Sequence, residues 1–233
     1  MDSAQAEKIF SESRHNPVFD FSQGLDDLFS AGDPEFIYRA GREWDTFDYR
    51  RGLDFLIRVR NAEFIHKAGI FWPEFDQVLG LEELIRLAEP DYIYRAGRFW
   101  KHYDHERGLS GLIALNQPRF IYYAGQEWKV FNFPRGMEAL FATGNAEYIF
   151  YAGAHWKAFD YTRGFEILLS SQQPEFIFKA GILWKEFDYS RAWKSLESLV
   201  IEGEEWRGKA LESPEWRRAL RQIWKEAFDE QKK

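Results

Sequence analysis

Apolar and aromatic residues recur along the chain at the spacing of an amphipathic helix. Between residues 34 and 47 they fall mostly at steps of three and four: Phe36, Ile37, Ala40, Gly41, Trp44 and Phe47. This period is typical of a helix with one buried face, and the strict alternation of a half-buried strand is absent. The pattern predicts a first helix that begins at Pro34, since proline suits the first helical position, and that continues through the tryptophan.

The helical pattern repeats with a 28-residue period. An Ala-Gly pair marks each copy, with its glycine at Gly41, Gly69, Gly97, Gly125, Gly153 and Gly181. A tryptophan follows three residues later in every copy, at Trp44, Trp72, Trp100, Trp128, Trp156 and Trp184. We predict that these two sets form the structural core of the repeats. A fixed period of this kind indicates units that bury their apolar faces against their neighbours.

A second helix is predicted in each copy. Asp48 follows Trp44 by four residues and suits the N-cap of this helix. Arg51 stands three residues after Asp48, a spacing that suits a local ion pair. A second periodic glycine, Gly52 in this copy, lies within the predicted helix, where glycine costs about 1 kcal/mol relative to alanine. We therefore expect the periodic glycines to let the two helices of one repeat cross closely.

The period predicts an all-α fold, an α-solenoid. It would be a superhelical stack of helical pairs, with seven 28-residue helix-turn-helix repeats in residues 1–201. A degenerate first repeat, 6–33, lacks the tryptophan and forms an N-terminal cap. The other repeats span 34–61, 62–89, 90–117, 118–145, 146–173 and 174–201. Residues 202–233 form a C-terminal helical cap, in which Pro214 and Trp224 keep the interval of Pro34 and Trp44.

Composition narrows the classes of protein that this solenoid can belong to. The chain has 233 residues, no cysteine and a formal net charge of -7. Without cysteine there are no disulfides, thiol nucleophiles or thiolate metal ligands. No apolar run approaches the roughly 20 residues that cross a bilayer, so we expect no membrane partner. The first residues are acidic and lack an apolar segment, and we expect a cytoplasmic protein.

One surface position per repeat forms the candidate partner-binding row. It lies two residues after the repeated isoleucine and holds Arg39, Lys67, Arg95, Tyr123, Tyr151 and Lys179. Cations and tyrosines in a row suit a protein or peptide partner, or alternatively the phosphates and bases of a nucleic acid. Acidic residues on the same outer surfaces balance the bases, so the sequence favours the protein or peptide.

The residue just before this row leaves two alternatives open. It is aromatic in each repeat, at Phe10, Tyr38, His66, Tyr94, Tyr122, Phe150 and Phe178. These side chains either pack against a neighbouring repeat or line an exposed groove.

Signals of catalysis are weak. The densest candidate for a metal site is the segment 102–105, where His102 and His105 flank Asp104. Asp104, however, takes the place of the helix cap in its repeat. No phosphate-binding loop or nucleophile elbow is present. We expect no catalytic residue, no metal and no cofactor. The sequence predicts a monomeric, non-enzymatic scaffold of the adaptor or inhibitor type that binds a protein or peptide along its extended surface.

Overall fold

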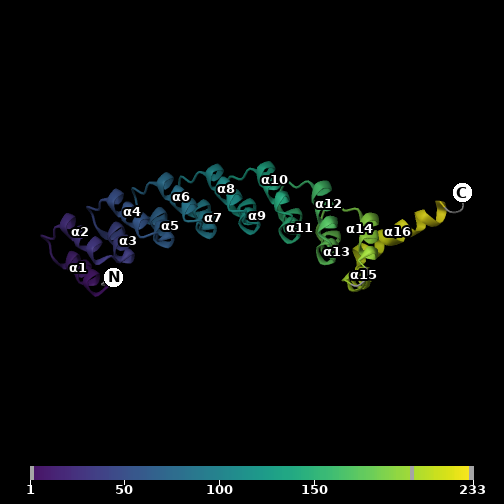
Figure 1. The fold of residues 1–233 in the computed structure, drawn as a ribbon, viewed down its shortest axis with the longest axis horizontal. Helices are drawn as coiled ribbons and strands as arrows, with labels where there is room; N and C mark the ends of the chain where they lie inside the picture. The colour runs from purple at the N-terminus through teal and green to yellow at the C-terminus, as the bar shows by residue number, and fades with distance from the viewer. Residues whose placement is uncertain (1–2, 200–201, 231–233) are drawn as a thin grey trace. The chain divides into compact units, whose positions relative to one another are not determined.

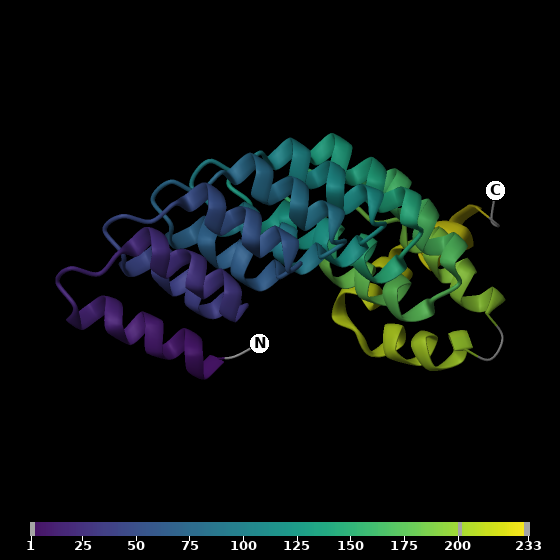
Figure 2. The same cartoon turned by 60° about the vertical axis from the view of Figure 1, so that its left-hand side comes forward.

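The computed structural model describes residues 3–199 and 202–230, and within these ranges it contains sixteen helices and no strand. Within each of the two compact units described below, helices that follow one another in the chain pack together, such as α1 on α2 and α11 on α12 (Figures 1 and 2). The prediction of an all-α solenoid of helical pairs is confirmed. No helix in the described ranges has the length and apolar character needed to span a bilayer.

The chain forms two compact units, and the first comprises Met1–Phe120 with Glu127–Val130. Its helices are α1 (Ser3–His15), α2 (Phe21–Ala31), α3 (Pro34–Glu43), α4 (Tyr49–Arg58), α5 (Ala62–Phe71), α6 (Gln77–Arg86), α7 (Pro90–Phe99) and α8 (His105–Ala114). The first helices of the pairs, α1, α3, α5 and α7, lie in one row, and each contacts the next (Figure 1).

The second unit comprises Ile121–Gln126 with Phe131–Lys233. Its helices are α10 (Phe133–Thr143), α11 (Ala146–His155), α12 (Tyr161–Ser171), α13 (Pro174–Leu183), α14 (Tyr189–Ser198), α15 (Glu202–Glu212) and α16 (Pro214–Glu230). Helix α9 (Pro118–Glu127) contributes residues to both units. Within the second unit, α11 contacts α13, and α13 contacts α15.

In the described part of the chain, the first helices of successive repeats begin 28 residues apart, as the sequence repeat predicts. First helices begin at Pro34, Ala62, Pro90, Pro118, Ala146 and Pro174. The division into seven repeats and a cap stays a prediction, and its boundary between residues 201 and 202 falls at residues 200–201, outside the described ones.

Side-chain caps determine where the helices begin. Asp48 Oδ1 accepts a hydrogen bond from the Arg51 N–H at 3.0 Å. The same N-cap contact recurs at Asp76, Asp104, Asn132, Asp160 and Asp188. Asn61 and Asn145 cap first helices in the same way, and Asp33 caps α3 by accepting from the Glu35 N–H, two residues later. Each cap pairs a donor that the helix leaves unsatisfied, so the predicted capping residues are confirmed.

Each first helix ends one residue before its tryptophan. Trp44 has φ -86 and ψ 130, which is extended backbone, and α4 begins only at Tyr49. The same holds at Trp72, Trp100, Trp156 and Trp184. The expectation that the first helix continues through the tryptophan is wrong. The three-residue spacing persists because a side chain just after a helix end can still turn toward the same core.

The periodic glycines make room for an aromatic ring. A Cβ added at Gly97 would lie 2.4 Å from Cε2 and Nε1 of Trp128, in the next repeat, a distance at which atoms overlap. The other first-helix glycines face a tryptophan of the next repeat in the same way: Gly41, Gly69, Gly125 and Gly153. A Cβ at Gly52 would lie 2.5 Å from the Phe47 ring. The expectation that these glycines make room for the other helix of the same repeat is therefore wrong, because the nearest neighbour of each is an aromatic side chain.

The tryptophans bind each repeat to the one before it. Their side chains are buried, and Trp128 Nε1 donates to the Tyr94 carbonyl at 2.9 Å. Equivalent bonds of 3.0–3.1 Å join Trp72 to Tyr38, Trp100 to His66, Trp156 to Tyr122 and Trp184 to Phe150. Each indole thus fills the space over a glycine and also satisfies its only polar group.

The repeated arginines also reach backward along the chain. Arg107 forms two hydrogen bonds of 2.5 and 2.6 Å with Glu82, in the preceding second helix, rather than with Asp104. Arg51 pairs with Asp26, Arg163 with Glu138 and Arg191 with Glu166 across the same interval. The predicted local pair is wrong, because each of these arginine side chains pairs with an acid of the preceding second helix instead.

The C-terminal cap uses a different tryptophan from the one expected. Trp216 is completely buried, its Nε1 donates to the Phe178 carbonyl at 3.0 Å, and its ring lies against Gly181. Trp224 is 48% exposed. The predicted register of Pro214 and Trp224 with Pro34 and Trp44 is therefore wrong. Helix α15 precedes α16, and Trp216, at the start of α16, takes the place of the missing repeat tryptophan.

Candidate partner-binding surface

In the first unit, the predicted row lies on the first helices of the pairs. Arg39 is on α3, Lys67 on α5 and Arg95 on α7. Lys67 pairs with Glu63 at 2.6 Å, and Arg95 pairs with Asp91 at 2.8 Å. Each acid stands one turn earlier on the same helix, and each cation also lies over the ring between them in sequence, Phe64 or Tyr92.

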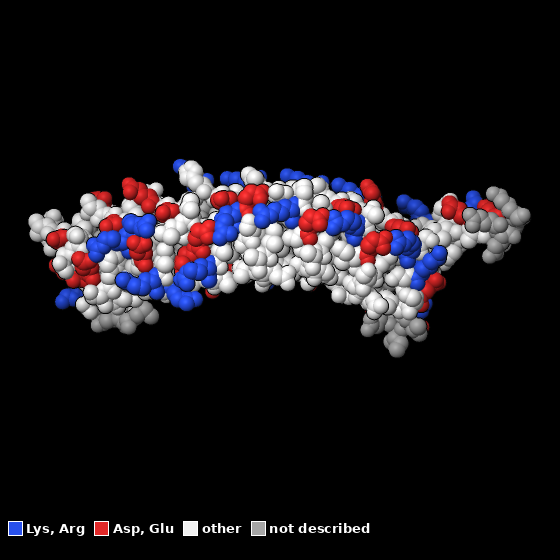
Figure 3. Space-filling view, turned by 45° about the horizontal axis from the view of Figure 1, so that its top comes forward, with Lys and Arg blue, Asp and Glu red and all other residues white. Residues whose placement is uncertain are grey.

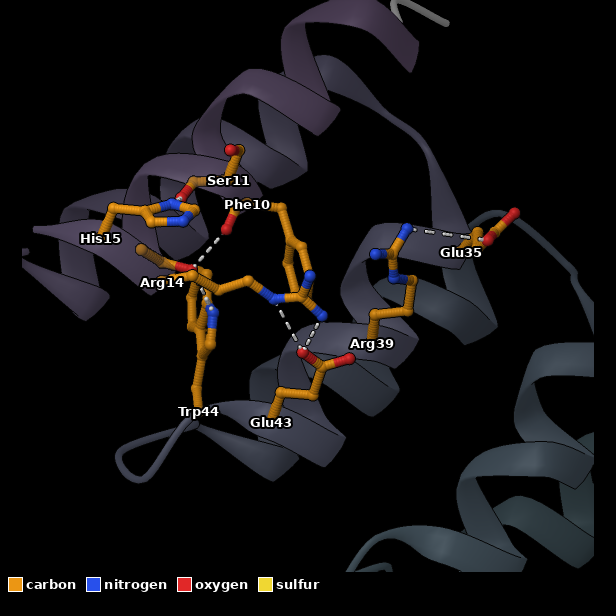
Figure 4. Close-up of polar contacts among 9 residues, drawn as sticks. Phe10, Ser11, Arg14, His15, Glu35, Arg39, Glu43 and Trp44 are labelled. Carbon is orange, nitrogen blue, oxygen red and sulfur yellow. Dashed lines mark hydrogen bonds and ion pairs between the residues drawn. The ribbon is translucent and has the colours of Figure 1, made fainter.

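Arg39 shows this arrangement at the N-terminal end of the row (Figure 4). Its guanidinium lies 4.5 Å from the ring centre of Phe10 and 4.9 Å from that of Phe36, and 4.0 Å from Glu35. Arg14 approaches the same place from α1 and pairs with Glu43 (Figure 4). The Arg39 guanidinium is therefore held by two aromatic rings and by the Glu35 carboxylate at once.

In the degenerate first repeat, a hydroxyl group replaces the direct tryptophan bond. Trp44 Nε1 donates to Ser13 Oγ at 2.9 Å, and Ser13 Oγ donates to the Phe10 carbonyl at 2.7 Å. Ser13 stands where the other repeats have glycine. The indole therefore reaches the equivalent carbonyl through one intervening hydroxyl.

In the second unit, the row changes from cations to tyrosines. Tyr151 is half-buried, and its ring centre lies 5.7 Å from that of Tyr122 and 6.2 Å from that of His155. Tyr123 lies 5.3 Å from Tyr122. Lys179 returns to the pattern of the first unit, because it pairs with Glu175 and lies 5.7 Å from the Phe176 ring centre.

The row is therefore not a stripe of uncompensated positive charge. All four of its cations have an acidic partner one turn earlier: Arg39 with Glu35, Lys67 with Glu63, Arg95 with Asp91 and Lys179 with Glu175. On the face that Figure 3 presents, Lys and Arg side chains likewise lie beside Asp and Glu. Nucleic-acid binding depends on several unneutralised cations along one track, which this pairing does not favour.

The aromatic residues just before the row are packed against neighbouring helices. Tyr38, His66, Tyr94, Tyr122 and Phe150 are all at most 7% exposed. In the second unit, the Tyr122 hydroxyl lies 2.9 Å from His155 Nδ1. In the first unit, burial and a hydrogen bond with Glu127 raise the pKa of Tyr94 to about 12. Of the two alternatives left open by the sequence, packing against a neighbouring repeat is confirmed for these five.

Two exposed phenylalanines lie beside the row in the first unit, and sequence reasoning missed them. Phe71 ends α5 and Phe99 ends α7, with 52% and 53% of their surface exposed. Arg42 lies 5.0 Å from the ring centre of Phe71, and Arg98 lies 5.0 Å from that of Phe99. Each exposed ring therefore has a charged group beside it, and apolar side chains edged by charged ones are a common composition of protein interfaces.

The second unit has an equivalent apolar position at the end of α13. Ile182 and Leu183 are 38% and 54% exposed. The signal for these residues was present in the repeat alignment, at the position just before each tryptophan: Glu43, Phe71, Phe99, Glu127, His155 and Leu183. Large apolar residues at a repeat position that also holds charged ones indicate that this position is exposed to solvent.

His66 is a buried histidine under Phe99. Its side chain is 7% exposed, its ring centre lies 6.4 Å from that of Phe99, and Nε2 has no hydrogen-bond partner among the described residues. Burial and the charge of Arg95 lower the pKa of His66 to about 4. The neutral ring is therefore the stable form near neutral pH.

The histidines of the segment 102–105 do not form a site together. His105 packs 5.4 Å from the ring centre of Trp128, with Nε2 3.2 Å from the Gly97 carbonyl, whereas His102 is exposed. Burial lowers the pKa of His105. Among the residues that the structure describes, no group of three or more His, Asp or Glu side chains is placed to hold a metal ion.

Comparisons of this chain with protein-family models, with curated proteins and with solved structures find no match.

Proposed function

We propose that this solenoid is a non-enzymatic scaffold that binds another protein or a peptide on the face formed by its first helices. The observation that carries the proposal is the exposure of Phe71 and Phe99 at equivalent positions of successive repeats. Exposed apolar side chains that recur on one face, with a polar edge, are characteristic of interaction sites. Solenoids commonly use such extended surfaces for binding.

The most strongly repeated residues have structural contacts, which supports binding rather than catalysis. The tryptophans fill the space over glycines, the aspartates cap helices and the arginines join neighbouring second helices. What varies among repeats is the row and the position before the tryptophan. Variation of this kind suits one specific partner, as in an adaptor or an inhibitor. The proposal includes a monomer that acts in the cytoplasm.

The test is affinity capture with variants of the proposed face. The double variant Phe71→Asp, Phe99→Asp is compared with Val18→Asp, Val130→Asp, which changes two other exposed apolar residues, 84% and 62% exposed. We expect the first pair to weaken binding of the captured protein at least roughly tenfold, about 1.4 kcal/mol, and the control pair to leave it unchanged. Equal binding by both would refute the proposed face.

A second comparison separates protein from nucleic acid. Capture is repeated with and without nuclease and across a series of salt concentrations. A protein partner survives nuclease, and its affinity changes little with salt. A nucleic acid contacted through several phosphates would lose affinity steeply as salt rises, because counterions are released on binding. Charge reversal of Arg39, Lys67 and Arg95 together then measures how much of the affinity comes from the row.

A further inference from the structure

One repeat lacks an aromatic side chain that its siblings use. The first residue of the second helix is aromatic in the six other repeats, at Phe21, Tyr49, His105, Phe133, Tyr161 and Tyr189. In the repeat 62–89 this residue is Gln77, at the start of α6. The comparison among repeats therefore shows what normally occupies the corresponding space.

The aromatic ring has one or two contacts in the sibling repeats. It packs against the tryptophan of the next repeat, for example Tyr161 against Trp184 with ring centres 5.7 Å apart. In two of these repeats the residue is a tyrosine whose hydroxyl also donates to the carbonyl of the repeat's own glycine, as the Tyr161 hydroxyl does to the Gly153 carbonyl at 3.2 Å. Tyr189 donates to Gly181 in the same way. This carbonyl belongs to the last turn of a helix, which has no backbone donor for it.

Gln77 makes neither contact. Its Oε1 accepts a hydrogen bond from the His102 N–H at 2.8 Å, which holds the side chain against the next loop. No side chain of the described residues donates to the Gly69 carbonyl, and the residue four positions later is Pro73, which has no N–H. The space and the acceptor that a tyrosine uses elsewhere are thus both left open in this repeat.

A groove of about 550 Å³ lies at this place, within the roughly 300–1,000 Å³ typical of ligand sites. It is lined by the end of α5, the loop after it, the start of α6 and the loop after α7, including Gly69, Phe71, Gln77, Val78, Lys101 and His102. Phe71 and Val78 are 52% and 72% exposed, so apolar walls flank the open acceptor.

The charged residues that line the groove indicate which charge a bound ligand would carry. Lys101 is exposed, and no ion pair among the described residues includes it. Asp76, on the opposite side, is already engaged, since it caps α6 and lies 3.9 Å from Arg50. The uncompensated charge is therefore positive, and it complements an acidic residue on the occupant.

We propose that this groove binds a tyrosine side chain of a partner peptide, with an acidic residue next to that tyrosine. The ring would occupy the position that Tyr161 and Tyr189 occupy in their own repeats, its hydroxyl would donate to the Gly69 carbonyl, and the acidic neighbour would pair with Lys101. The inference rests on the proposed function, because it names the chemistry of the peptide that the scaffold binds.

The probe is a capped peptide, acetyl-Asp-Tyr-Glu-amide, titrated into the full chain and followed by amide and indole signals in NMR spectra. We expect saturable shifts at Gly69, Phe71 and His102 with a dissociation constant on the order of 1 mM. The Phe analogue lacks the donor, and the acetyl-Lys-Tyr-Lys-amide analogue reverses the charge, so both should bind several-fold more weakly. No saturable shifts at these residues, or equal binding of all three peptides, would overturn the proposal.

Two variants locate the binding. Gln77→Tyr restores the sibling side chain, so it should fill the groove and abolish the peptide shifts while the protein stays folded. Lys101→Glu should remove the preference for acidic neighbours. Shifts that persist in Gln77→Tyr would place the peptide elsewhere and reject the groove. Tyr161→Gln provides the converse test, because it should open a second groove over Gly153 with its own peptide shifts.

The two proposals can fail separately. If the captured partner depends on Phe71 and Phe99 while its affinity is the same for Gln77→Tyr and the wild type, the binding face stands and the tyrosine groove is rejected. If the peptide shifts are present but the capture is insensitive to Phe71 and Phe99, the groove stands and the proposed face is rejected.

Discussion

At the scale of residues, the tryptophan and glycine of adjacent repeats form a single packing unit. The indole ring occupies the volume that a glycine leaves free, and Nε1 bonds to a carbonyl three residues before that glycine. Neither residue can change alone. A side chain in place of the glycine would overlap the indole ring, and a smaller ring in place of the tryptophan would leave a cavity. The cost of glycine within a helix, about 1 kcal/mol, is offset by burial of the indole.

Replacing Gly97 tests this unit. In Gly97→Val the new side chain overlaps Trp128, so we expect the free energy of unfolding to fall by about 2–4 kcal/mol through overpacking and loss of the bond to Tyr94. Chemical denaturation measures the change. Gly208→Val is the control, since nothing lies within 4 Å of a Cβ at Gly208. Equal effects of the two substitutions would contradict the packing argument.

His66 predicts a pH dependence of stability. Its pKa is about 4 in the folded protein and about 6.5 in an unfolded chain, so between these values the unfolded state binds more protons. The stabilisation is therefore complete above about pH 6.5 and is lost as the pH falls toward 4, by about 1–3 kcal/mol. The comparison variant is His66→Phe, since Phe150 takes this position in another repeat. If the free energy of unfolding of this variant depends on pH as that of the wild type does, a role of His66 is excluded.

At the scale of elements, each helix is delimited locally but is held in place by contacts with the preceding pair. The capping aspartates act within three residues. The arginines act across 25 residues, from the start of one second helix to the middle of the one before. Exposed ion pairs of this kind contribute about 0–1 kcal/mol each, so they align the helices more than they stabilise them.

The repeat 62–89 interrupts this series of ion pairs. Leu79 stands where its siblings have arginine, and Asp54, at the position of the acid in the preceding second helix, pairs with Arg50 instead. We expect Leu79→Arg to pair with Asp54 and to raise the free energy of unfolding by a few tenths to about 1 kcal/mol at low salt. The gain should disappear in about 1 M salt, where charges are screened. Leu79→Gln is the neutral control, and a gain that survives high salt would contradict the ion pair.

At the scale of the whole molecule, the described contacts join each repeat to the next one along the chain. The tryptophan bonds span 34 residues and the arginine pairs span 25. Stability in such a chain is a sum of repeat and nearest-neighbour terms, so damage at one contact should stay local.

Hydrogen exchange can measure this locality. In Gly97→Val we expect amides of α7 and α8 to lose more protection than those of α13 and α14, because the altered contact is between Gly97 and Trp128. A loss of protection that is uniform over the described helices would show that the molecule opens as one cooperative unit instead.

Much of the fold could be predicted from the sequence, since its signals are local and periodic. The 28-residue period, the prolines that open first helices and the aspartates that cap second helices all act within a few residues. The candidate site was less predictable. The cations of the row could be placed on the first helices of the pairs, but their pairing with acids one turn earlier was not part of the prediction. The exposed Phe71 and Phe99 resemble core residues by type.

The sequence by itself determined the fold class, the period and the residues that cap the helices, because helix formation and capping depend on neighbours within about four residues. Only the tertiary structure decided the partners of the side chains that act at longer range. Trp216 rather than Trp224 fills the last tryptophan position, Arg107 reaches Glu82 rather than Asp104, and Gln77 leaves a groove over Gly69. These outcomes depend on how one helical pair packs on the next, which spacing along the chain does not specify.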